Sequence, residues 1–283
     1  MKNEKQTWTE EIKSETHLFS INFREIWHYR DLLIMLVKRD FITFYKQTIL
    51  GPLWFIVQPL LTTIIFIILF GNIAKISTDG APQLAFYLAG ITIWNYFSDS
   101  LTKTTSVFTS NASIFGKVYF PRLIMPLSIV TSSLLKFAVQ FALFILVVLY
   151  YTFVKNSIHP NLWVLFTPIL ILLMALFALG VGMIFSSLTT KYKDLSFLIA
   201  FGIQLFMYIT PVVYPSSVLP EKFKFLGKIN PLSSIFECFR YAYLGNGIFT
   251  GFDLLMSASI ILVLFFVGIV IFNKVEKSFM DTV

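Results

Sequence analysis

Long apolar runs separated by short polar breaks dominate the chain after residue 50. Each run has about 20 residues or more, which is enough for an α-helix to cross a hydrocarbon core of about 30 Å. Strands of a membrane barrel would instead need about 9–11 alternating residues. The pattern therefore predicts an all-α membrane protein with six transmembrane helices. The predicted spans are Leu53–Ile73, Leu84–Val107, Leu123–Val154, Leu162–Leu188, Leu195–Tyr214 and Leu254–Phe272.

The segment before the first run, residues 23–46, shows a helical period instead of a continuous apolar run. An amphipathic helix of this kind lies in the membrane interface and does not cross the bilayer. Packing within a cytoplasmic subdomain is the alternative. The apolar side carries Ile26, Tyr29, Leu33, Leu36, Val37, Phe41 and Phe44, and the polar side carries His28, Asp31, Lys38, Arg39 and Lys46.

Two boundaries flank this amphipathic segment. Residues 1–22 are polar and charged without a strong period, which predicts a cytoplasmic tail. The Gly51-Pro52 pair breaks the helix before the first span begins. The three expected units are therefore residues 1–22, 23–46 and the transmembrane domain 47–283.

A long segment of mixed character, residues 216–252, separates the last two spans. It is half apolar, and two short helices are expected at Leu219–Ile229 and Leu232–Leu244. Asn230 and Pro231 are typical of a helix N-terminus, and Gly245 is typical of a C-terminus. Helices too short to span, placed between two full spans, predict re-entrant or interfacial structure over about residues 216–246.

The distribution of basic residues orients the predicted spans. Six spans place both termini on one side, and positively charged short loops mark the cytoplasmic side. That side would carry Lys103, Lys117, Arg122, Lys191, Lys193, Lys274 and Lys277, whereas Lys75, Lys155 and the four basic residues of the long segment 216–252 lie opposite. The bias is therefore counted over the short loops. We therefore expect both termini in the cytoplasm.

Composition supports the membrane class and narrows the function. The chain is 57% hydrophobic and 13% charged, against about 45–50% and about 25% in soluble domains. The net charge of +7 fits a basic cytoplasmic surface, so we expect no nucleic-acid partner. The single cysteine, Cys238, and three distant histidines predict no metal site.

No enzyme signature appears in the sequence. The chain has no G-x-x-x-x-G-K-[ST] phosphate loop, no G-x-S-x-G elbow and no H-E-x-x-H motif. Glu237 and Arg240 are the only close charged pair in the outer segment, and their three-residue spacing favours an ion pair. We expect a non-enzymatic membrane protein without catalytic residues.

The content of the spans distinguishes among transport mechanisms. Ion-coupled transporters need ionisable groups at mid-membrane, and Lys136 is the one deep candidate here. Ala178, Gly182 and Ser186 form a stripe that would let two helices approach closely. Aromatic and amide side chains at helical spacing suggest a passage for a sugar-like chain, although packing or lipid contact is the alternative. These channel candidates are Phe55, Gln58, Phe66 and Phe70 on the first span and Phe197, Phe201, Gln204 and Tyr208 on the fifth.

Several stretches, in this order, resemble the membrane subunit of type-2 ABC exporters, specifically the branch that exports O-antigen, teichoic acid and related polysaccharides. The resemblance extends over nearly the whole chain from about residue 24. It is carried by YKQTILGPLWFIVQPLL at 45–61, GKVYFPRLIMPLS at 116–128, KYKDLSF at 191–197, TPVVYPSSVLPEKF at 210–223 and NPLSSIFECFRYAYLG at 230–245.

This resemblance implies partners and a mechanism. It implies a homodimer in the bacterial inner membrane with a channel between the subunits, two copies of an ABC ATPase, membrane lipid around it and a lipid-linked polysaccharide as substrate. ATP and Mg would bind the partner ATPase, and no cofactor would bind this chain. Exporters of a drug, peptide or lipid and an ion-coupled transporter are the alternatives.

The resemblance also assigns roles to particular residues. The amphipathic helix and a coupling helix at about 106–120 would contact the ATPase, and the two short outer helices would form a gate. The ATPase-contact candidates are Lys38, Arg39, Ser110, Asn111, Ile114, Phe115 and Lys117. The outer-gate candidates are Phe223, Asn230, Pro231, Glu237 and Arg240.

Overall fold

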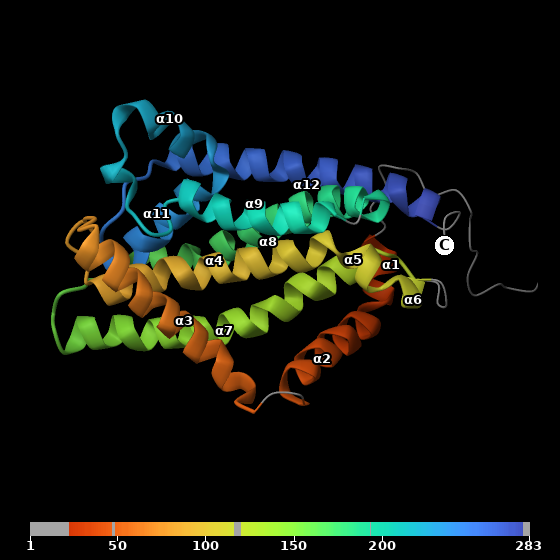
Figure 1. Ribbon diagram of the computed structural model, residues 1–283, viewed down its shortest axis with the longest axis horizontal. Coiled ribbons are helices and arrows are strands. Elements are labelled where there is room, and N and C mark those ends of the chain that lie inside the picture. The colour runs from red at the N-terminus through yellow and green to blue at the C-terminus, as the bar shows by residue number, and fades with distance from the viewer. Residues whose placement is uncertain (1–22, 47–48, 116–119, 193, 280–283) are drawn as a thin grey trace, which may run out of the picture.

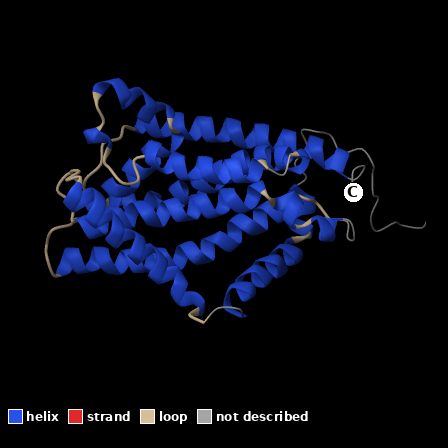
Figure 2. Cartoon of the chain, viewed as in Figure 1, coloured by secondary structure: helices blue, strands red, loops and turns tan. Residues whose placement is uncertain are grey.

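The computed structural model describes residues 23–46, 49–115, 120–192 and 194–279, and this part of the chain contains helices and loops but no strand (Figure 2). The α-helices are α1 (Phe23–His28), α2 (Arg30–Lys46), α3 (Trp54–Phe66), α4 (Gln83–Thr105), α5 (Val107–Ser110), α6 (Ala112–Phe115), α7 (Ile124–Phe153), α8 (Thr167–Lys191), α9 (Leu195–Ile209), α10 (Glu221–Ile229), α11 (Pro231–Leu244) and α12 (Gly251–Phe279). Short 3₁₀ segments lie at Gly51–Leu53, Leu162–Phe166 and Ser216–Val218, and α3 continues as a π-helix over Ile67–Ile73.

Four helical segments among the described residues are long and apolar enough to cross a membrane. They are Gly51–Ile73, Ile124–Phe153, Leu162–Lys191 and Gly251–Val275. α9 is apolar but has only 15 residues, and α4 has 23 residues but a more polar sequence. The all-helical membrane class is confirmed, whereas the count of six spans stays a prediction.

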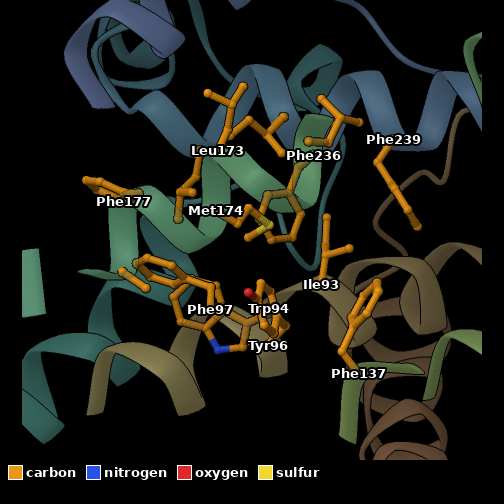
Figure 3. Packing of buried hydrophobic residues seen from close by; sticks show 14 of the residues in the cluster. Ile93, Trp94, Tyr96, Phe97, Phe137, Leu173, Met174, Phe177, Phe236 and Phe239 are labelled. Carbon is orange, nitrogen blue, oxygen red and sulfur yellow. The ribbon is translucent and has the colours of Figure 1, made fainter. Parts of the chain in front are cut away.

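Helix α4 forms the centre of the subunit. It contacts α3, α7, α8, α9 and α11, and most of its side chains are buried. Its aromatic residues meet those of the surrounding helices: Phe97 stacks on Phe177 of α8 at 5.2 Å, and Tyr96 lies against Phe137 of α7 (Figure 3). Aromatic packing around one central helix therefore holds the long helices side by side (Figure 1).

Small residues allow the closest helix contacts. A Cβ atom added to Gly180 would lie 2.7 Å from the Phe265 Cα atom of α12, and one added to Gly182 would lie 2.6 Å from the Thr104 side chain of α4. Ala178 and Ser186, on the same stripe of α8, are fully buried. The predicted close approach along this stripe is confirmed, and it joins α8 to α4.

The two ends of the helix bundle carry different short elements. Helices α1, α5 and α6 lie at the end of the bundle where α12 ends, and α10 and α11 lie at the opposite end (Figure 1). This arrangement separates the predicted ATPase-contact region from the predicted outer helices. Residues 1–22, the expected cytoplasmic tail, lie outside the described residues.

The structure corrects several predicted boundaries. The fifth span was expected to reach Tyr214, but α9 ends at Ile209 because Pro211 forces an extended conformation on Thr210 (ψ 141°). The last helix starts at Gly251 instead of Leu254, because Thr250 and Asp253 cap its N-terminus reciprocally: the Thr250 amide donates to Asp253 Oδ2 (3.1 Å) and the Asp253 amide donates to Thr250 Oγ1 (3.2 Å). It also continues to Phe279, beyond the predicted end at Phe272.

Two predicted helices are each divided in the structure. The amphipathic segment 23–46 forms α1 and α2, which meet at Tyr29. The coupling region expected at 106–120 forms two four-residue helices, α5 and α6. Residues 116–119 of that region, including Lys117, lie outside the described residues.

Candidate functional site

The helix α2 lies along α7 and presents a mixed surface. Leu36 is buried, and the other described members of the predicted apolar stripe are partly buried. Four further apolar side chains of α1 and α2 are exposed: Trp27, Ile34, Met35 and Ile42. A helix that packs on the protein and still exposes apolar side chains beside charged ones fits a position in the membrane interface.

A sharp change of direction separates α2 from the first span. The two helices diverge from their junction (Figure 1), and Gly51 has a positive φ of 49°. No neighbouring atom lies within 4 Å of the position that a Gly51 Cβ would occupy. The glycine is therefore required by its backbone conformation and not by lack of space.

The channel candidates on the first span lie in two different environments. Phe55 and Phe66 are 6% and 8% exposed, so both point into the subunit. The Phe66 ring contacts Phe70 at 5.4 Å and Tyr87 of α4 at 6.3 Å, edge to face. Gln58 is exposed and Phe70 is half-buried. Two of the four side chains thus help to pack α3 on the subunit, and a role in substrate passage stays a prediction.

The candidates on the fifth span share an exposed face of α9. Phe197 is 81% exposed, Phe201 57% and Tyr208 52%, and Gln204 is also exposed. Within α9 only Ile203 is buried. A helix with this much exposed apolar surface requires lipid, a second copy of the chain or another partner against it.

The deep lysine of the third predicted span has a charged partner. Lys136 Nζ lies 2.7 Å from Asp99 Oδ2 of α4, and its ammonium group sits 6.0 Å from the ring of Phe55. Nearby, Arg39 pairs with Asp40 of α2 at 2.8 Å, and Ser132 Oγ donates to Asp40 at 3.4 Å. These contacts join α2, α3, α4 and α7, so Lys136 has a structural use that needs no transported ion. The sequence could not show this pairing, because it depends on the alignment of α4 with α7.

The described ATPase-contact candidates lie in two places: Lys38 and Arg39 are on α2, and Ser110, Asn111 and Ile114 are on or between α5 and α6. Lys38, Arg39 and Ser110 are exposed, and Ile114 is half-buried. The Asn111 side chain donates to the Val107 carbonyl at 3.0 Å, which closes the turn between α5 and α6. The side chain of Phe115, like Lys117, lies outside the described residues. The structure leaves the contact role of this set as a prediction.

The N-terminus of α11 has the capping arrangement that the sequence predicts. Asn230 accepts a hydrogen bond from the Leu232 amide at 3.0 Å, and its side-chain amide donates to Thr210 Oγ1 at 2.9 Å. Pro231 occupies the first turn, and Gly245 ends the helix with a φ of 77°. On α10, Phe225 is 67% exposed, and the side chain of Phe223 lies outside the described residues.

The predicted ion pair of Glu237 and Arg240 is present and almost fully buried, at 2% and 1% exposure. Their closest atoms, Arg240 Nη1 and Glu237 Oε1, are 3.7 Å apart. Arg240 donates to the carbonyl groups of Val212 (2.6 Å) and Tyr214 (3.1 Å) and lies over the Phe86 ring of α4 at 3.9 Å. Arg240 therefore holds the loop that contains Val212 and Tyr214, in addition to pairing with Glu237.

Glu237 also holds loops, through both oxygens of its carboxylate. We call Glu237, Arg240 and the two loops that they hold the outer clamp. One carboxylate oxygen accepts from the amide and hydroxyl of Ser216 at 3.0 and 2.9 Å, and the other accepts from the Ile248 amide at 3.0 Å. Loops on both sides of α11 are thereby fixed to it. The sequence signal for the clamp was two charges in an otherwise apolar short helix, but the loop contacts were not predictable from spacing.

The loop between the first span and α4 joins the same region. Ser217 Oγ donates to Asp79 Oδ2 at 2.8 Å, and Asn246 donates to the Asp79 carbonyl at 2.7 Å. A Cβ on Gly90 of α4 would collide with the Val212 carbonyl oxygen. Close helix contact and loop hydrogen bonds together make this end of the subunit a compact cap.

The sequence is similar to those of known proteins. The sequence profile of a family described as "ABC-2 type transporter" matches residues 31–244. Two O-antigen export system permease proteins RfbA from Klebsiella pneumoniae are 31% and 32% identical over 252 and 254 residues, which covers 89% of this chain and 94% of each relative. The polysialic acid transport protein KpsM from Escherichia coli is 23% identical over 87% of this chain and 94% of its own.

Proposed function

Because the chain belongs to the ABC-2 type transporter membrane family, we propose that it is the membrane subunit of an ATP-driven exporter of lipid-linked polysaccharide, of O-antigen or teichoic acid type. The observation that carries the substrate class is the similarity to O-antigen export permeases along nearly the full length of both chains. The subunit would itself bind no nucleotide, and ATP and Mg would bind a separate ATPase.

The proposed assembly contains two copies of this chain and two copies of the ATPase in the bacterial inner membrane, with both termini in the cytoplasm. The exposed surface of α9 supports a second copy as neighbour, since five of the helix's large side chains are more than half exposed. The substrate would pass between the copies, along α9 and the exposed part of α3. Aromatic rings there would stack on sugars, and Gln58 and Gln204 would hydrogen-bond their hydroxyl groups.

The proposed coupling begins at the cytoplasmic end. Closure of the ATPase pair would press on α2, α5 and α6, and two of these helices, α2 and α5, have a defined connection to the spans. The Asp40–Ser132 contact joins α2 to α7, and Phe108 of α5 stacks on Phe272 of α12 at 4.6 Å. Such contiguous packed contacts are what transmission across this distance requires.

Reconstitution tests the proposal. The full-length chain and a candidate partner ABC ATPase would be placed in liposomes with a radiolabelled lipid-linked glycan, and glycan that becomes inaccessible to an external glycosidase would be measured. We expect ATP-dependent movement with the intact ATPase and none with a hydrolysis-deficient one. ATP hydrolysis without glycan movement would contradict the polysaccharide assignment, and ATP-dependent movement of a drug, peptide or free lipid instead would favour that exporter class.

A second arm examines the channel. Phe201→Ala and Tyr208→Ala should lower glycan movement while ATP hydrolysis continues. Val263→Ala on α12 is the matched control, because Val263 is also more than half exposed but lies on another helix. Unchanged transport in the α9 variants would remove these side chains from the proposed pathway.

A further inference from the structure

Polar side chains line the contact between α4 and α7 in a regular antiparallel register. Asn95 Nδ2 donates to Gln140 Oε1 at 3.3 Å, and one turn along each helix Lys136 donates to Asp99 at 2.7 Å. The Tyr96 and Phe137 rings lie 5.4 Å apart in the same register. Continuing by one more turn places Ser100 opposite Ser133. We call this contact the polar seam.

Several buried groups of the polar seam have no protein partner. The Tyr96 hydroxyl, Ser100 Oγ, Ser133 Oγ and Gln140 Nε2 form no hydrogen bond with the part of the chain that the structure describes. Ser100 follows Tyr96 by one turn of α4, and the two side chains are neighbours. All four side chains are at most 3% exposed, so neither lipid nor a second copy of the chain reaches them.

Buried polar groups without a partner carry a desolvation cost, and native proteins satisfy the large majority of them. Water fills this need where two to four polar groups converge. The register of α4 against α7 places the four groups at one helix contact. At the edge of the seam Asp99 and Lys136 retain 31% and 17% side-chain exposure, which provides a route for water.

We propose that the polar seam between α4 and α7 is a binding site for ordered water molecules, held by Tyr96, Ser100, Ser133 and Gln140. On another side of α4 the contact is aromatic, because Phe97 lies there against Phe177 of α8 and Phe206 of α9. Water in the seam lets the polar groups of α4 and α7 exchange partners if the two helices shift, without leaving any of them unbonded.

Radiolytic hydroxyl-radical labelling of the full-length chain, assembled with its ATPase in nanodiscs, tests this site. Radicals form from water during the pulse, so a buried side chain beside bound water is oxidised quickly. Tyr243 is the matched control: it is buried to 3% exposure, and its hydroxyl is paired with Thr167 Oγ1 at 2.8 Å. We expect Tyr96 to be oxidised several-fold faster than Tyr243, and equal or slower oxidation would overturn the proposal.

A double variant, Ser100→Ala with Ser133→Ala, tests which side chains hold the water. The expected result is that oxidation of Tyr96 falls toward the rate of Tyr243. The rate at Tyr243 should stay unchanged, which shows that the fold is intact. Fast oxidation of Tyr96 that persists in the double variant, with Tyr243 still protected, would contradict the assigned water ligands.

Discussion

Arg240 is the most deeply buried charge among the described residues, and its loss has a large predicted cost. Arg240→Ala would leave Glu237 charged and buried, together with two loop carbonyls that lose their donor. Removing one member of such a buried pair costs about 3–5 kcal/mol. We expect the purified Arg240→Ala variant to unfold at a clearly lower temperature than the unaltered chain. Arg30→Ala is the matched control, since its pair with Asp31 is exposed (58% and 88%), and no measurable shift is expected there.

Equal unfolding temperatures for these two variants would show that the outer clamp contributes little to stability.

Individual residues also show which contacts could be predicted from the sequence. Asn230 and Gly245 were predictable because capping depends on neighbouring residues and backbone conformation alone. The Asp99–Lys136 pair was not, because its formation depends on how two distant helices align. Local chemistry was therefore readable, whereas partners across helices were not.

At the scale of helix pairs, two glycines in long helices predict opposite effects of the same substitution. Gly180→Ala places a methyl group against the α12 backbone, 2.7 Å from Phe265 Cα, and overpacking of this kind costs about 1–3 kcal/mol. Gly202 of α9 has no neighbouring atom within 4 Å of its Cβ position, so Gly202→Ala should gain about 0.5–1 kcal/mol from helix propensity. Thermal unfolding of both variants gives the comparison. Destabilisation by both substitutions to the same extent would contradict the packing argument.

The junction between α2 and α3 predicts a change in coupling. Gly51 adopts a positive φ, which costs other L-residues about 1–2 kcal/mol, although asparagine tolerates it better. Gly51→Ala should therefore shift the angle between the two helices and lower the glycan moved per ATP hydrolysed, with Gly51→Asn less affected. Dimer assembly should change little, since a Cβ at residue 51 meets no neighbour. If assembly falls as far as coupling does, residue 51 acts through folding and not as a hinge.

Element boundaries show where periodicity stops being informative. Apolar runs located the long helices, because burial in lipid or protein requires continuous apolar surface. They did not locate the ends of α9 and α12, which are set by Pro211 and by the Thr250–Asp253 capping pair. Pro211 lies inside an apolar run, so hydropathy alone extends the fifth span past the end of α9. Thr250 and Asp253 lie just before an apolar run, so hydropathy alone starts the sixth span too late.

At the scale of the whole molecule, the two ends of the bundle predict opposite accessibility. Lys155 lies in the loop between α7 and α8, and Lys274 lies near the end of α12, at the other end of the subunit (Figure 1). Cys238 is fully buried, so the unaltered chain should not react with a membrane-impermeant maleimide. We expect Lys155→Cys to be labelled in intact spheroplasts and Lys274→Cys only after permeabilisation. Labelling of both variants in intact spheroplasts would contradict cytoplasmic termini.

The sequence assigned the channel to the first and fifth spans, and the arrangement of a dimer gives that assignment a direct test. In a symmetric pair, residues on the shared face approach their own copies across the two-fold axis. Phe201 of α9 and Val263 of α12 are similarly exposed, at 57% and 61%, but lie on different helices. With a bifunctional maleimide, Phe201→Cys should give a covalent dimer in native membranes and Val263→Cys should not, because α12 would then face lipid. The reverse result would place the second copy against α12, and α9 would be the lipid-facing helix.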